Sequence, residues 1–80
     1  MIDERIRSVL AEHGQLAVDV ATIKDDDDLY LVGLTSHATV NVMLGLEDEL
    51  QVEFPERLIR RSTFQSVAAI RTAVNECTAP

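Results

Sequence analysis

The fold of this chain is constrained most by the stretch from Asp28 to Leu50, DLYLVGLTSHATVNVMLGLEDEL. A turn in this stretch leads into a long amphipathic segment, and we predict a helix over residues 36–51. Thr35 is a good N-cap residue, and Ser36 could share that role. The start of a helix gathers unpaired backbone N–H groups and the positive end of the macrodipole. Ser36 is therefore a position at which an attached phosphate would be stabilised.

The apolar residues of this predicted helix form two stripes on a helical wheel. The expected core face, with helical spacing, consists of Thr39, Val42, Met43, Leu46 and Leu50. Val40 and Leu44 fall on the opposite, polar side with His37, Asn41, Asp48 and Gln51. These two residues are either ordinary exposed side chains or a docking patch beside Ser36. Glu47, Asp48 and Glu49 would give such a patch an acidic rim.

The remaining helices are predicted from periodicity, caps and breakers. We expect them over residues 3–13, 55–60 and 63–77, with Gly14 ending the first, Pro55 in the first turn of the short third and Ser62 or Thr63 capping the last. The core faces expected of the first and last helices are Ile2, Ile6, Val9 and Leu10, and Phe64, Val67, Ile70 and Val74. Thr78, Ala79 and Pro80 should fray. The predicted fold is all-α, a small antiparallel four-helix bundle of three longer helices and one short, in a single domain of residues 1–80.

A long connection, residues 14–35, separates the first two helices. Its apolar residues can pack down onto the helices: Leu16, Val18, Val20, Ile23, Leu29, Leu31 and Leu34. Asp25 to Asp28 do not have the alternating ligands, the glycine or the final Glu of a calcium loop. We expect a solvated acidic loop instead, and a solvated charged face on the first helix from Asp3 to Arg7.

Charge and cysteine content restrict the possible partners. The 80 residues carry a net charge of −7 with a pI near 4.5, which argues against nucleic-acid binding and favours partners with basic patches. The single cysteine, Cys77, cannot form an internal disulfide, and we expect no role for it. The sequence indicates neither a signal peptide nor a membrane span, so we expect a cytoplasmic monomer.

An enzyme is not indicated. Ser36 and His37 are adjacent, and adjacent helical residues point about 100° apart, so they do not face each other as a catalytic pair. His13 is expected at a helix end and not as a metal ligand. No other grouping of nucleophile, base and orienting residue is evident, and no metal site.

The segment Gly33-Leu34-Thr35-Ser36-His37 resembles the attachment motif of acyl and peptidyl carrier proteins, and the resemblance extends from Ile2 to about Val74. It implies a 4′-phosphopantetheine group on Ser36, transferred from coenzyme A by a phosphopantetheinyl transferase and ending in a thiol that holds cargo as a thioester. Four residues depart from the pattern of fatty-acid carriers: Thr35 replaces Asp, His37 replaces Leu, and Ala38 and Asn41 replace acidic residues. Such changes exclude some partners as well as attract others.

A narrower resemblance rests on Gly14-Gln15-Leu16, Met43-Leu44-Gly45-Leu46-Glu47 and Glu53-Phe54-Pro55. These segments are similar to stand-alone carriers charged by truncated, seryl-tRNA-synthetase-like amino acid:[carrier protein] ligases. The cargo implied is a small amino acid, such as glycine or alanine, activated with ATP and without tRNA. The residues expected to dock partners are Thr35, His37, Val40, Asn41, Leu44, Glu47 and Asp48.

Two alternatives remain open: a carrier of a fatty or polyketide acyl chain, and an unmodified helical interaction module. Arg57, Arg60 and Arg61 form a small basic group, which is either solvated or touches an acidic surface on a partner. No Lys or Arg lies between Lys24 and Arg57, so the acidity is concentrated around Ser36.

Overall fold

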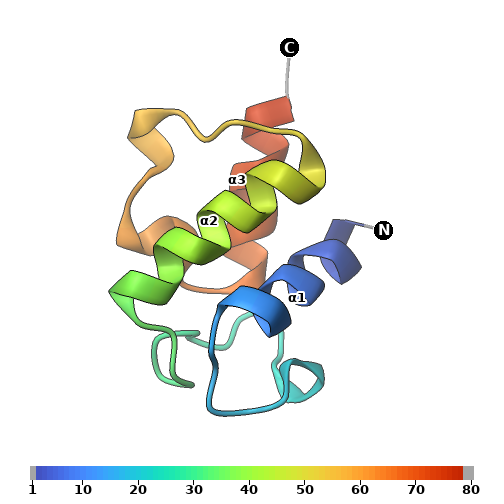
Figure 1. Cartoon of the computed structure of the whole chain (residues 1–80), viewed down its shortest axis with the longest axis vertical. Helices are drawn as coiled ribbons and strands as arrows, with labels where there is room; N and C mark the ends of the chain where they lie inside the picture. Colours follow the sequence, from blue (N-terminus) through green and yellow to red (C-terminus); the bar gives the residue numbers. More distant parts are fainter. Residues whose placement is uncertain (1, 79–80) are drawn as a thin grey trace.

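The computed structural model describes residues 2–78, with side chains through Cys77, so Ala79 and Pro80 of the expected frayed end lie outside it. Within this range the chain is helical and contains no strand (Figure 1). The elements in chain order are α1 (Ile2–His13), the 3-10 turn η1 (Val20–Thr22), α2 (Ser36–Leu50), the 3-10 turns η2 (Glu56–Leu58) and η3 (Arg61–Phe64), and α3 (Val67–Thr78). The prediction of an all-α fold is confirmed.

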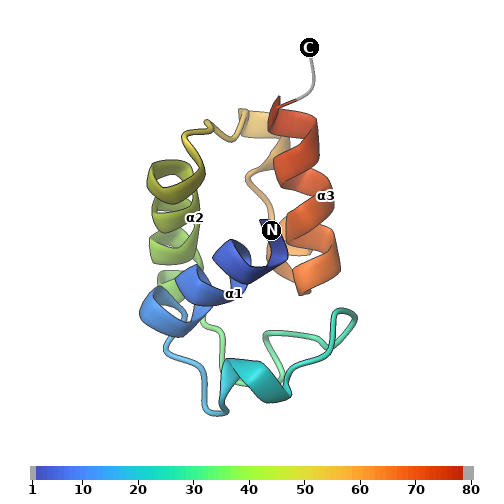
Figure 2. The ribbon, with the colours of Figure 1, turned by 90° about the vertical axis from the view of Figure 1, so that its right-hand side faces the viewer.

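The helices enclose one core, with α1 packed against both α2 and α3. Figure 2 shows α2 and α3 on opposite sides, with α1 in front of them and the long connection beneath. Of the predicted α1 face, Ile6, Val9 and Leu10 are buried and Ile2 is partly buried. All four residues of the face predicted for the last helix are buried, with Phe64 in η3 and Val67, Ile70 and Val74 in α3. The periodicity of these two helices was therefore a sound guide to their orientation.

The core face of α2 is rotated slightly from the predicted one. Its fully buried residues are Ala38, Val42 and Leu46, while Met43 and Leu50 are partly buried. Thr39 is only partly buried, and its hydroxyl donates to the backbone oxygen of Thr35 at 2.7 Å. Ala38, one of the four residues that depart from the fatty-acid carrier pattern, is enclosed in the core.

The predicted third helix, residues 55–60, is not an α-helix but the 3-10 turn η2. The last helix begins at Val67 and not near residue 63, because η3 occupies residues 61–64. Its cap is neither Ser62 nor Thr63: the Ser66 hydroxyl oxygen accepts a hydrogen bond from Ala69 N at 3.0 Å. This segment offers several possible caps, and periodicity alone did not separate them.

Close helix packing places α1 directly on the middle of α2. A Cβ atom at Gly45 would lie 2.7 Å from Cδ2 of His13 and 2.9 Å from Cγ1 of Val9. A glycine inside a helix costs stability relative to alanine. Here it allows the two helices to approach, and His13 serves as packing at the end of α1.

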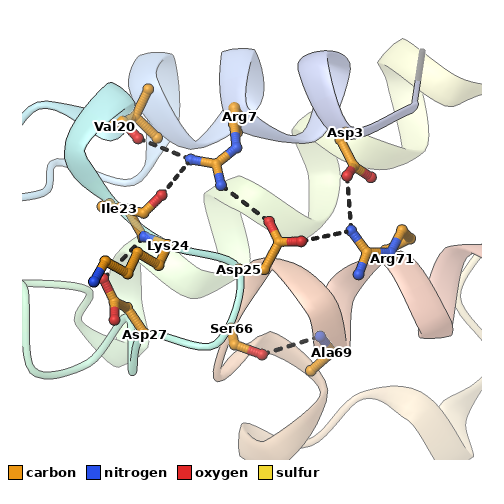
Figure 3. Close-up of polar contacts among 10 residues, drawn as sticks. All are labelled: Asp3, Arg7, Val20, Ile23, Lys24, Asp25, Asp27, Ser66, Ala69 and Arg71. Carbon is orange, nitrogen blue, oxygen red and sulfur yellow. Dashed lines mark hydrogen bonds and ion pairs between the residues drawn. The ribbon is translucent and has the colours of Figure 1, made fainter.

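The long connection is held by a half-buried ionic group, which we call the Asp25 cluster (Figure 3). Asp25 pairs with Arg7 at 3.1 Å and with Arg71 at 3.2 Å, and Arg71 also pairs with Asp3 at 2.7 Å. Hydrogen bonds from Arg71 and Arg7 hold the pKa of the Asp25 carboxyl below its usual range. The expectation of a solvated face at Asp3 and Arg7 was therefore wrong.

Most of the aspartate run is likewise structural. Asp27 accepts from Lys24 N at 2.9 Å, as Figure 3 shows. Asp28 accepts from Tyr30 N at 2.9 Å and from the side-chain amide of Gln65 at 3.3 Å. The backbone oxygen of Asp25 accepts from Ala68 N at 3.0 Å, so the loop also caps α3. The loop that was predicted to be solvated therefore joins α1, the connection and α3 through ion pairs and hydrogen bonds.

The apolar anchors of the connection are fewer than predicted. Ile23, Leu29 and Leu34 are buried, and Leu16 and Val20 are partly buried. Val18 and Leu31 are exposed, with Leu31 at 84%. The alternation of the sequence did not separate Leu29, which is buried, from Leu31, which is not.

Candidate functional site

The start of α2 is fixed by its cap. Thr35 has extended backbone angles, and its hydroxyl oxygen accepts a hydrogen bond from Ala38 N at 3.0 Å. The predicted N-cap is therefore confirmed. Ser36 is the first helical residue and its side chain is exposed, so the hydroxyl is accessible to another protein. The backbone N–H groups of this first turn have no acceptor within the helix.

The turn before Ser36 is tightly built. Gly33 has a φ of +115°, which L side chains rarely adopt, and a Cβ there would lie 2.8 Å from Ala17 N. Ala17 N donates to Val32 O at 2.9 Å, and Leu34 N donates to Leu29 O at 3.0 Å. These bonds tie the turn to the connection, and Ser36 is held on a rigid support.

A groove of about 210 Å³ opens beside Ser36. One wall is the outer side of α2, and the other is the segment of residues 59–64 that contains η3, which Figure 1 shows in orange beside the green start of α2. Apolar side chains line much of it: Tyr30, Val40, Met43, Ile59 and Phe64. Arg60 and Arg61 line it as well, so the groove combines apolar walls with cationic groups next to the hydroxyl.

Two exposed apolar residues, Val40 and Ile59, line this groove, and Leu44 follows Val40 by one helical turn; we call these three residues the apolar patch. They are Val40 at 51% exposure, Leu44 at 53% and Ile59 at 50%. The exposure predicted for Val40 and Leu44 from the helical wheel is confirmed. Ile59 was missed: it lies within residues 55–60, which were predicted to be a short helix, and it has no periodic partner there.

The other predicted docking residues surround the start and the outer side of α2. His37 and Asp48 are exposed like Thr35, while Asn41 and Glu47 are partly buried. Glu47 is also structural, since its carboxylate accepts from Phe54 N at 2.9 Å and so holds the turn after α2. Its role in docking remains a prediction, as does that of the other six.

The described residues offer little for other chemistry. Ser36 and His37 are both exposed, and no hydrogen bond joins their side chains. Within residues 2–78, no three His, Cys, Asp or Glu side chains are grouped to hold a metal ion. Cys77 is partly buried against the core, and burial raises the pKa of its thiol. No helix in the described part of the chain has the length and apolar character needed to cross a membrane.

An exposed hydroxyl at a capped helix start, beside a groove with cationic groups, fits a phosphorylated arm. Residues 4–71 match the family described as "Phosphopantetheine attachment site". The chain belongs to this family, and it is therefore a carrier protein and not an enzyme, as the sequence predicted.

The relatives of known structure or function are carriers too. The chain is 48% identical over 69 residues to an aminoacyl carrier protein of Agrobacterium fabrum, covering 86% of this chain and 83% of the relative. It also resembles the carrier protein from Agrobacterium tumefaciens in complex with an engineered Bradyrhizobium japonicum glycine:[carrier protein] ligase and ATP. That match has 43% identity and a TM-score of 0.93 over 95% of this chain and 99% of the other.

A further similar structure is the Bradyrhizobium japonicum glycine:[carrier protein] ligase complexed with glycylated carrier protein. The match has 34% identity and a TM-score of 0.75, and it covers 89% of this chain and 95% of the other. The resemblance to stand-alone amino acid carriers, stated from short segments of sequence, is confirmed at the level of the whole chain.

Proposed function

We propose that Ser36 carries 4′-phosphopantetheine and that the protein holds a small amino acid, with glycine as first candidate, as a thioester on this arm. The observation that carries the proposal is the exposed Ser36 side chain at the start of α2, inside the region that matches the family. The arm would supply a thiol, and a thioester keeps the carbonyl carbon reactive toward the next enzyme.

The chain itself would provide the surface that partner enzymes recognise and would hold the attachment site in place. Thr35 and the Gly33 turn fix the position of the hydroxyl, and the first-turn N–H groups favour a phosphate there. The base and the metal for attachment would come from a phosphopantetheinyl transferase, as membership of the phosphopantetheine-attachment family implies.

The proposed loading partner is an amino acid:[carrier protein] ligase similar to the glycine ligase bound by the relatives. The apolar patch and the exposed residues of α2 are the proposed contact surface. We place the protein in the cytoplasm, where a ligase using ATP and a transferase using coenzyme A would meet it.

The attachment is tested by mass spectrometry of the protein co-expressed with a broad-specificity phosphopantetheinyl transferase. The wild type should gain one phosphopantetheine, and Ser36→Ala should gain none. Ser8→Ala, an exposed serine on α1, is the matched control and should be modified fully. A wild-type protein that remains unmodified would contradict the proposal and favour an unmodified interaction module.

The cargo is tested by loading the modified protein. The Bradyrhizobium japonicum glycine ligase, ATP and radiolabelled glycine should give a labelled protein whose label is released by hydroxylamine, as expected of a thioester. If no amino acid is loaded while an acyl-activating enzyme loads the arm readily, the carrier serves fatty or polyketide chains instead.

A further inference from the structure

Arg61, beside the proposed attachment site, stacks on an aromatic ring and forms no ion pair with a described carboxylate. Its guanidinium carbon lies 3.8 Å from the centre of the Tyr30 ring, and the Tyr30 hydroxyl donates to the backbone oxygen of Arg61 at 3.1 Å. Stacking on an aromatic face fixes the plane of a guanidinium but leaves the N–H groups at its edge free to bind an anion. Arg61 is thus ordered without being neutralised.

Among residues 2–78, no carboxylate forms an ion pair with Arg61 or with its neighbour Arg60. The other arginines of the same half of the chain differ: Arg57 pairs with Glu76 at 3.2 Å, and Arg71 pairs with two aspartates. In a chain of net charge −7, carboxylates are abundant. Two guanidinium groups without a carboxylate partner therefore line one groove, and the stacked Arg61 presents its N–H edge to an anion from outside the polypeptide.

The position of the groove favours a phosphodiester on Ser36 over an acidic partner surface as the bound anion. Arg60, Arg61 and Ser36 all line the same space of about 210 Å³, so a charge attached to the Ser36 oxygen would lie within reach of the guanidinium groups. Arg60 and Arg61 are both exposed, so an acidic partner surface would compete for them only while that partner is bound. A phosphodiester on Ser36 is attached covalently at the same groove and is always present in the modified protein.

We propose that Arg61, supported by Tyr30 and assisted by Arg60, binds the phosphodiester of the arm and so orients the arm along the groove. This inference rests on the proposed attachment to Ser36. Arg61 acts as a positioning residue: it takes no part in forming or breaking the thioester. Tyr30 acts through Arg61 by holding the plane of its guanidinium.

The direct test is NMR of the modified protein, verified by mass spectrometry so that failed attachment is recognised separately. The side-chain Nε–H signal of Arg61 should shift between the unmodified and modified forms, and that of Arg57 should not. The transverse relaxation of the ³¹P signal should be slower in Arg61→Gln than in wild type, because the phosphate moves more freely. Arg61→Lys should give a ³¹P relaxation rate between those of Arg61→Gln and the wild type, because lysine keeps the charge but lacks the planar guanidinium.

Arg57→Gln is the matched control, because Arg57 is an exposed arginine of the neighbouring turn and does not line the groove. It should leave the ³¹P relaxation at the wild-type value. The effect of Arg61 should also shrink when the salt concentration rises from about 0.05 to about 0.5 M, since exposed charge pairs are screened.

Unchanged ³¹P relaxation in both Arg61→Gln and Arg60→Gln overturns the proposal. It is also overturned if Arg61→Gln weakens loading by the glycine ligase while the phosphate signal stays unchanged, because the arginine then serves an acidic partner surface. Tyr30→Leu gives a second check. It should raise the mobility of the Arg61 side chain and of the phosphate together, whereas Tyr30→Phe, which keeps the ring, should raise neither.

Discussion

The Asp25 cluster and the groove beside Ser36 use arginine in opposite ways. In the cluster, Arg7 and Arg71 each meet a carboxylate and join the connection to two helices (Figure 3). In the groove, Arg61 is ordered on an aromatic ring and has no carboxylate partner among the described residues. The same contrast holds for leucines, since Leu29 is buried in the connection and Leu44 is exposed on α2. Side chains that satisfy one another stabilise the fold, whereas unpaired charges and exposed apolar side chains gathered at one groove are candidates for binding other molecules.

The largest expected effect distinguishes two leucines of the connection. Leu29→Ala should lower the free energy of unfolding by about 2–5 kcal/mol, because it leaves a cavity in the core. Leu31→Ala should change it by less than about 0.5 kcal/mol, because the side chain is already in solvent. Urea denaturation followed by circular dichroism measures both. Equal losses would mean that Leu31 is also packed, and the connection would then be more enclosed than the structure describes.

A smaller effect is expected on docking. Leu44→Asp or Val40→Asp should slow loading by the glycine ligase about tenfold or more, equivalent to about 1.4 kcal/mol, because a charge enters an apolar contact. Neither should destabilise the fold by more than about 0.5 kcal/mol. Val18→Asp is the control, since Val18 is exposed on the connection and does not line the groove. If Leu44→Asp unfolds the protein, or if Val18→Asp slows loading equally, the apolar patch is not the docking surface.

The smallest effect concerns the pH dependence of the Asp25 cluster. Because arginines lower the pKa of Asp25 in the folded protein, the folded state binds its proton less readily than the unfolded chain does. Asp25 therefore contributes stability above the ordinary Asp pKa of about 3.9, and this contribution is lost as the pH falls through the lowered value. Solvent exposure keeps the contribution small.

Asp25→Asn should remove that part of the fall in stability between about pH 5 and pH 3, measured by thermal unfolding at each pH. Asp26→Asn, an exposed neighbour, should keep the wild-type profile. Identical profiles for wild type and Asp25→Asn would show that the cluster does not couple folding to protonation.

Local signals in the sequence predicted the parts of the structure that depend on neighbouring residues. The Thr35 cap and the exposure of Val40 and Leu44 follow from residues within one or two helical turns. The Asp25 cluster did not have such a signal: Asp25 and Arg71 are 46 residues apart, and a run of four aspartates in a connection is typical of a solvated loop. The groove escaped prediction for the same reason, since Tyr30 and Arg61 are brought together only by the fold.

The Gly45 contact has a consequence for re-engineering. Exchange of surface residues on α2 is an obvious way to redirect a carrier to a new enzyme. A transplanted helix with any larger residue at position 45 would collide with the side chains of Val9 and His13, so these side chains or α1 itself would have to shift. Swaps that retain the glycine should preserve the bundle, whereas whole-helix grafts from donors without it need a matching first helix. The partner specificity of this surface is thus tied to the packing on its reverse side.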